Sequence, residues 1–73
     1  MLYTVIKNHR VEGGETSSSV RYDSLKEALR NYHQFAANYM ADSSVKAWSL
    51  AVVETDAGED MRILELSSYA DPD

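Results

Sequence analysis

The sequence contains no cysteine, only one proline and three glycines, and no long apolar run. Without cysteine, neither a disulfide framework nor a thiolate metal site can form. No segment approaches the ~20 apolar residues that a membrane-spanning helix needs. The first residues also lack the basic and long apolar parts of a signal peptide, so we expect a cytoplasmic protein. His9 and His33 fall in different predicted elements, and we expect no bound metal or cofactor.

The 73 residues allow one domain, spanning 1–73, and their composition is that of a folded protein: 44% are hydrophobic and 26% are charged. A domain of this size buries only about 60% of the surface that its unfolded chain exposes. Its margin of stability is therefore thin, on the order of 5 kcal/mol. Because disulfides are excluded, oligomerisation is the obvious supplement.

The first third of the chain predicts a β-hairpin. Residues 2–11 are rich in β-branched and aromatic types, and residues 16–22 read as a returning strand. Gly13 and Gly14 tolerate the positive φ of a tight turn. The run of three serines weakens the second strand, which could equally be a loop that orders only near residues 20–22. A two-residue turn at the glycines would place Val11 opposite Thr16, Lys7 opposite Val20, and Val5 opposite Tyr22.

A helix is predicted from about residue 25 to residue 41. Ser24 can cap the first turn and Glu27, three residues on, can reach back, which is a capping-box pattern. The residues expected on the core face recur at helical spacing and are Leu25, Leu29, Tyr32, Ala36, Tyr39 and Met40, widened by Ala28 and Phe35. The residues expected to face outward are Lys26, Arg30, His33, Gln34, Ala37 and Asn38.

The last third of the chain predicts a second hairpin. Residues 45–54 alternate between a bulky face (Trp48, Leu50, Val52) and a face of small side chains (Ala47, Ser49, Ala51, Val53). Residues 55–60 form a turn segment, 61–68 return as a strand, and 69–73 are a short acidic tail. A five-residue loop would put Leu64 and Leu66 on the bulky face, and Ile63, Glu65 and Ser67 beside the small one.

Together these elements predict an α+β fold. The order β-β-α-β-β gives one four-stranded antiparallel sheet with a single helix packed on one face. One helix can cover only one face of such a sheet, so the other face must be solvated or covered by a partner.

The formal net charge of −5 is distributed unevenly. Residues 1–53 carry six Lys or Arg and five acids, a net of +1, whereas residues 54–73 carry seven acids and one base, a net of −6. The acidic end either forms a solvated surface that aids solubility or produces an electrostatic field that attracts a basic partner.

Motifs for catalysis are missing from the sequence. It has no G-x-S-x-G nucleophile elbow and no phosphate-binding glycine loop, and residues 54–60 lack the spacing of a twelve-residue calcium loop. Arg21, Lys26 and Arg30 could gather near the start of the helix, but the negative net charge disfavours direct binding to nucleic acid. We therefore expect a protein that binds another macromolecule and is not an enzyme.

Two surfaces are candidates for that contact. The first is the acidic end, where carboxylates could occupy a Lys- and Arg-lined site that serves phosphates in the partner. Its residues are Glu54, Asp56, Glu59, Asp60, Glu65, Asp71 and Asp73. The second is the small-residue face of the sheet, suited to self-association or docking. Its residues are Ala47, Ser49, Ala51, Val53, Met61 and Ile63.

In size, acidity, lack of cysteine and layout, the chain resembles the very short acidic anti-defence proteins of phages and mobile elements, particularly anti-CRISPR proteins. That group has no defining residue motif, so the resemblance transfers no functional residue. It implies an inhibitor that blocks the basic nucleic-acid-binding surface of a defence nuclease, such as a CRISPR effector, through the acidic hairpin and tail. The alternative is a structural or regulatory homodimer.

Overall fold

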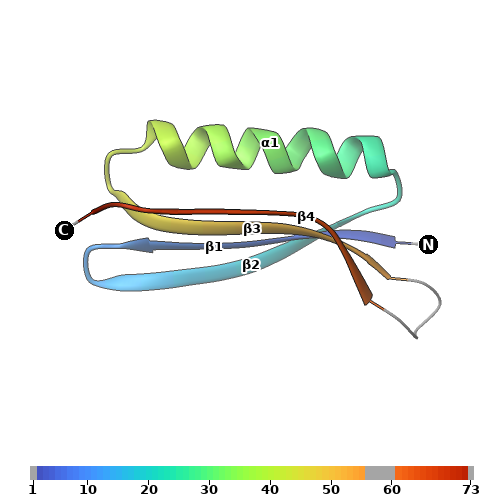
Figure 1. The fold of residues 1–73 in the computed structure, drawn as a ribbon, viewed down its shortest axis with the longest axis horizontal. Helices are drawn as coiled ribbons and strands as arrows, with labels where there is room; N and C mark the ends of the chain where they lie inside the picture. The colour runs from blue at the N-terminus through green and yellow to red at the C-terminus, as the bar shows by residue number, and fades with distance from the viewer. Residues whose placement is uncertain (1, 56–60, 73) are drawn as a thin grey trace.

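The computed structural model describes residues 2–55 and 61–72, and these form the predicted β-β-α-β-β fold. The strands are β1 (Leu2–Val11), β2 (Gly14–Tyr22), β3 (Val45–Thr55) and β4 (Met61–Ala70), and the helix is α1 (Leu25–Ala41). All neighbouring strands are antiparallel, in the order β2-β1-β3-β4. The helix lies along one face of this sheet and leaves the opposite face uncovered (Figure 1).

The hairpin of β1 and β2 is tighter than the sequence analysis predicted. Val11 pairs with Gly14, so the turn residues are Glu12 and Gly13, and only Gly13 adopts a positive φ, of 96°. The predicted register, centred on the two glycines, is therefore wrong: Thr16 lies opposite His9, Ser18 opposite Lys7, Val20 opposite Val5 and Tyr22 opposite Tyr3. Each partner is displaced by two residues, which preserves the side of the sheet on which every side chain lies. The serine run is part of the strand and not a loop.

The helix has the predicted bounds. The Ser24 hydroxyl accepts a hydrogen bond from the Glu27 backbone N–H at 3.3 Å, which satisfies one of the free donors of the first turn. Ala28 and Tyr32 are buried against the sheet. Leu25 and Met40, predicted to face the core, are instead 37% and 58% exposed. They stand near the two ends of the helix, which extend past the buried middle of the sheet.

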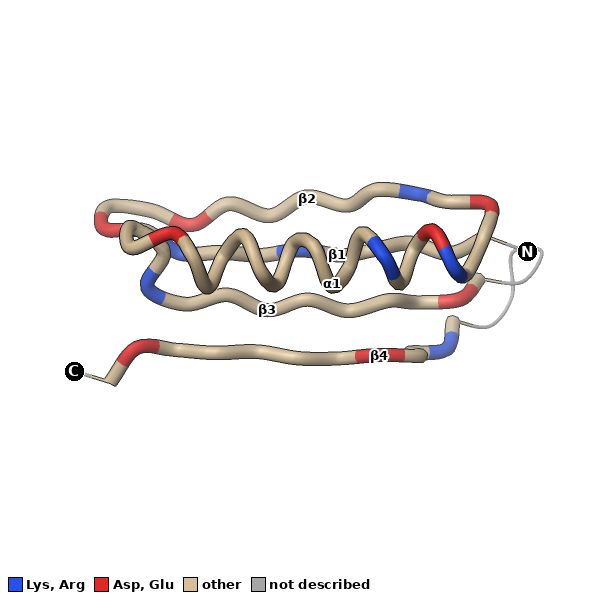
Figure 2. The backbone as a smooth tube through the Cα atoms, turned by 90° about the horizontal axis from the view of Figure 1, so that it is seen from above, with Lys and Arg blue, Asp and Glu red and all other residues tan. Residues whose placement is uncertain are grey.

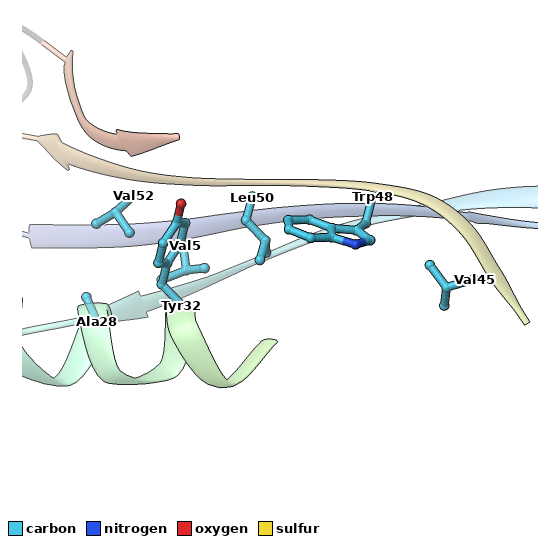
Figure 3. Packing of buried hydrophobic residues seen from close by; sticks show 7 residues of the cluster. All are labelled: Val5, Ala28, Tyr32, Val45, Trp48, Leu50 and Val52. Carbon is cyan, nitrogen blue, oxygen red and sulfur yellow. The ribbon is translucent and has the colours of Figure 1, made fainter. Parts of the chain in front are cut away.

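The core lies between α1 and the central strands β1 and β3. Its buried members are Val5, Ala28, Tyr32, Val45, Trp48, Leu50 and Val52 (Figure 3). The predicted bulky face of β3 is confirmed, because Trp48, Leu50 and Val52 are at most 8% exposed. Val5 on β1 pairs with Val52 and is fully buried, so the two central strands supply the floor on which the helix packs.

A β-bulge in β4 overturns part of the predicted second hairpin. Val52 pairs with Glu65 and Val53 pairs with Ile63, so Leu64 is an additional residue without a partner on β3. Beyond a bulge of one residue the alternation of side chains is reversed. Leu66 therefore lies beside Ala51 on the uncovered face, and Glu65 and Ser67 lie on the helix side, each opposite to the prediction. The strand also continues through Tyr69 and Ala70, which the sequence analysis assigned to the tail.

Candidate functional site

The uncovered sheet face divides into two halves of different chemistry. We call the half built from β3 and β4 the β3–β4 strip. Its residues, taken from the strand register, are Ala47, Ser49, Ala51, Val53, Thr55, Met61, Ile63, Leu66, Ser68 and Ala70. None of these side chains is charged. All six residues of the predicted docking face belong to this strip.

Large apolar side chains of the β3–β4 strip are exposed to solvent. Met61, Ile63 and Leu66 are 69%, 60% and 67% exposed, and all three stand on the same strand. Val53, in contrast, is only 4% exposed, because it is flanked by Thr4 on β1 and by Ile63 on β4. The strip therefore has a packed centre bordered by a row of accessible apolar side chains. Grouped exposure of this kind is typical of surfaces that bind other molecules.

The other half of the uncovered face, on β1 and β2, is polar except for Leu2 and Ile6. Arg10 lies opposite Glu15, and the neighbouring row carries Asn8 opposite Ser17. The Asn8 amide donates a hydrogen bond to the Ser49 hydroxyl at 3.2 Å, which joins the polar half to β3. A hollow of about 280 Å³ lies over these rows near the β1–β2 turn. Its lining includes Ala47 and Ser49, so the hollow reaches the edge of the β3–β4 strip.

The carboxylates predicted to form an acidic contact surface do not share one end of the molecule. Among the described members of that set, Glu54 lies near the β3–β4 turn and forms an ion pair with Arg62 at 2.9 Å. Glu65 directly follows the bulge residue Leu64 on β4, pairs with Val52, and is exposed. Asp71 lies at the opposite end of the sheet, where its backbone N–H bonds the Lys46 carbonyl at 2.8 Å. Figure 2 shows acidic residues at both ends. Asp56, Glu59, Asp60 and Asp73 lie outside the described residues.

The two histidines occupy separate positions, as expected. His9 packs on Tyr39 with ring centroids 5.0 Å apart, and His33 lies on the outer side of α1 beside Tyr32. Within residues 2–55 and 61–72, no three His, Asp or Glu side chains converge as a metal site would require. No helix in this part of the chain is long and apolar enough to cross a membrane.

Sequence reasoning missed a second hollow, on the helix side of the sheet. Tyr39 from the last turns of α1, Trp48 from β3 and Tyr69 from β4 line it together with two aspartates. The sequence analysis missed it because the predicted strand ended at residue 68, which left Tyr69 in the tail, and because the predicted hairpin had no bulge. With the bulge, Tyr69 lies directly opposite Trp48.

Comparisons with known proteins found no match. No protein-family model, no curated protein and no solved structure resembles the chain closely enough to be significant.

Proposed function

We propose that this chain is a non-catalytic protein-binding module that associates with a second copy of itself through the β3–β4 strip. The observation that supports this proposal is the row of Met61, Ile63 and Leu66, each at least 60% exposed on a face that none of the described helices and strands covers. Burying apolar surface stabilises an assembly by about 25 cal/mol per Å². A domain with so small a core has little stability of its own, and a dimer interface would add to it.

The absence of charge on the β3–β4 strip permits a second copy as the occupant. Two chains that each carry −5 repel one another, so they can associate closely only through a surface that brings no carboxylates together. The β3–β4 strip is uncharged over its whole length. A two-fold interface places the same patch on both partners, and an uncharged apolar patch is complementary to itself.

The size of the surface is compatible with a dimer. A specific interface buries at least about 1,000 Å² in total, or about 500 Å² from each partner. That is about a tenth of the 5110 Å² that the chain exposes. The strip extends along strands of ten and eleven residues in a molecule 41 Å long.

Light scattering and sedimentation over a range of protein concentrations test the proposal. The wild type should change from monomer to dimer as its concentration rises. Ala51→Arg puts a charge in the middle of the strip and should keep the protein monomeric. Ala37→Arg makes the same substitution on the exposed outer side of α1 and should dimerise like the wild type. A wild type that stays monomeric, or two variants that behave alike, would reject the dimer.

A second candidate is the acidic inhibitor of a nucleic-acid-binding protein. Glu65 is exposed, and the net charge of −6 over residues 54–73 favours a basic partner. This candidate predicts capture of a basic protein from a bacterial lysate at low salt but not at high salt. Replacing Asp56, Glu59 and Asp60 by lysine should abolish capture. Capture that persists after charge reversal would exclude the acidic end as the contact.

A further inference from the structure

Strand β2 forms an open edge of the sheet. It stands first in the strand order and, among the described strands, pairs only with β1. Figure 2 shows that none of the described elements lies beyond it. Every second residue of an edge strand directs its backbone N–H and C=O away from the sheet, where they can pair with another extended strand. This edge is separate from the β3–β4 strip, so an interaction through it does not depend on the proposed function.

The middle of β2 lacks the features that usually protect an edge. Natural edge strands are blunted by bulges, charged side chains or proline. The opposite edge strand has two of these features, since β4 carries the bulge at Leu64 and the charged side chains of Arg62 and Glu65. In contrast, β2 pairs with β1 without a register shift, and its residues 16–20 include no charged residue and no proline. This segment of β2 is therefore open to pairing with a further strand.

The charges on either side of this uncharged segment are of opposite sign. Glu15 precedes the segment and Arg21 follows it, at equal distances in sequence from Ser18. Their partners on β1 are Arg10 and Thr4, which place both side chains on the uncovered face of the sheet. Within residues 2–55 and 61–72, neither Glu15 nor Arg21 forms an ion pair. A strand with this arrangement is complementary in charge to an antiparallel copy of itself.

We propose that β2 pairs antiparallel with β2 of a second copy about a two-fold axis at Ser18. Residues that pair across such an axis are symmetric about it, so Glu15 of each copy lies opposite Arg21 of the other. Opposite charges and hydroxyl side chains are both favourable when they face each other across two strands. The other opposed pairs are Thr16 with Val20, Ser17 with Ser19, and Ser18 with itself.

Neighbouring registers lose this match. An axis at Ser19 brings Glu15 of one copy opposite Asp23 of the other, so that two carboxylates face each other. An axis at Ser17 leaves Arg21 opposite Gly13, without a charged partner. Like charges directly opposite each other destabilise a strand pair. The charges therefore select the axis at Ser18 among these registers.

Pairing at this edge buries mainly backbone and small polar side chains, so it gains little from apolar burial. We expect a transient contact at micromolar concentration, too weak to appear as a dimer in sedimentation. The strip and the β2 edge lie on different strands, so one copy can use both surfaces at once. A chemical cross-link detects such a transient contact.

The chain has no cysteine, so an introduced thiol is unique. Ser18→Cys places two thiols opposite each other at the proposed axis, where Cα atoms are about 4.5–5.5 Å apart and a disulfide can form. Ala37→Cys on the exposed outer side of α1 is the control, and each rate of dimer cross-linking is divided by the rate at which that thiol reacts with a small disulfide reagent. The corrected rate of Ser18→Cys should be about tenfold higher or more, because pairing raises the effective concentration of the thiols.

Adding Ala51→Arg separates this contact from the proposed dimer of the β3–β4 strip. The double variant Ser18→Cys with Ala51→Arg should cross-link as fast as Ser18→Cys alone. A rate that falls to that of the Ala37→Cys control would assign the cross-link to the strip dimer and overturn pairing at the β2 edge. The same conclusion follows if Ser18→Cys itself cross-links no faster than the control.

A mixture of two variants tests the register. When equal amounts of Ser17→Cys and Ser19→Cys are oxidised together, the disulfide between the two variants should exceed the half share that random collision gives. Mass spectrometry of the isotopically labelled and unlabelled chains measures this share. A random share would overturn the register centred on Ser18.

A charge exchange tests the ion pairs. Glu15→Arg places like charges opposite each other and should slow the cross-linking of Ser18→Cys about fivefold, the scale of one or two exposed ion pairs. Adding Arg21→Glu should restore the rate, although it does not repair the contact of residue 15 with Arg10 within the chain. Circular dichroism checks that each variant is folded. Cross-linking that stays slow in the folded exchanged variant would overturn the proposed pairing.

Discussion

The hydroxyl of Tyr32 donates a hydrogen bond of 2.7 Å to the Ser67 hydroxyl, which ties the middle of α1 to the edge strand β4. Tyr32 is 4% exposed, so this bond lies at the boundary of the core. It forms only because the bulge at Leu64 turns Ser67 toward the helix. The helix otherwise packs mainly on the central strands, so this polar contact joins it to the strand that carries the exposed apolar row, a strand already held by its pairing with β3.

Removing this bond should destabilise the fold measurably. Tyr32→Phe keeps the ring and deletes the hydroxyl, and we expect it to lower the free energy of unfolding by about 0.5–1.5 kcal/mol. Urea denaturation of Tyr32→Phe, Ser67→Ala and the double variant forms a complete cycle. The double variant should cost less than the sum of the single ones. Strictly additive effects would mean that the two hydroxyls do not interact in solution.

Burial distinguishes two residues that both look apolar in the sequence. Leu50 is 1% exposed, and Leu50→Ala should cost about 2–5 kcal/mol, which is most of the stability expected for this domain. Met40 is 58% exposed, and Met40→Ala should change the free energy of unfolding by less than about 0.5 kcal/mol. Thermal or urea unfolding of the two variants measures both values. A large loss of unfolding free energy in Met40→Ala would show that Met40 is packed against other residues in solution.

Stability at low pH should depend on the turn that ends the helix. The Ser44 hydroxyl and backbone N–H hold the pKa of Asp42 below its usual value of 3.8. Because the folded pKa is lower than the unfolded one, this carboxylate contributes stability above the unfolded pKa, and that contribution is lost as the pH falls through the folded pKa.

Ser44→Ala removes the larger of these two causes while leaving the backbone N–H in place. The pKa of Asp42, followed by NMR through its carboxyl carbon, should rise toward 3.8 in this variant. The acid transition should begin at a higher pH than in the wild type. An Asp42 titration that is identical in both proteins would contradict the role of the Ser44 hydroxyl.

The elements could be predicted from local sequence because each local preference agrees with the fold. Ser24 and Glu27 marked the start of the helix, and the alternation at Trp48, Leu50 and Val52 marked the buried side of β3. The failures have one physical cause in common: pairing between strands depends on non-local contacts. The turn at Glu12 and Gly13 shifts the pairing of β2 by two residues, and the bulge at Leu64 adds one residue to β4; no local signal in the sequence separates these registers.

The candidate surfaces were predictable to different degrees. The small side chains of β3 lie on the uncovered face as their alternation indicated, but Leu66 joins them only through the bulge. Charge in the sequence suggested one acidic end, yet Glu54 and Asp71 are separated by the length of β3. Sequence proximity of charges does not specify spatial proximity when a strand of ten residues runs between them.

Salt should strengthen the proposed dimer. Added salt screens the repulsion between two chains of net charge −5, and the uncharged strip contains no ion pair that salt could weaken. Raising sodium chloride from about 0.05 M to about 0.5 M shortens the Debye length by roughly threefold, and the dissociation constant from sedimentation equilibrium should fall. A dissociation constant that rises with salt would indicate contact through charged groups instead.

Intermolecular NMR contacts test the β3–β4 strip most directly. A mixture of labelled and unlabelled wild-type protein at millimolar concentration is examined for nuclear Overhauser effects that cross from one copy to the other. We expect them at the methyl groups of Ile63 and Leu66 on the uncovered face and none at those of Leu25, which lies on the helix. Cross-peaks confined to Leu25, or no intermolecular cross-peaks at all, would contradict self-association through this face.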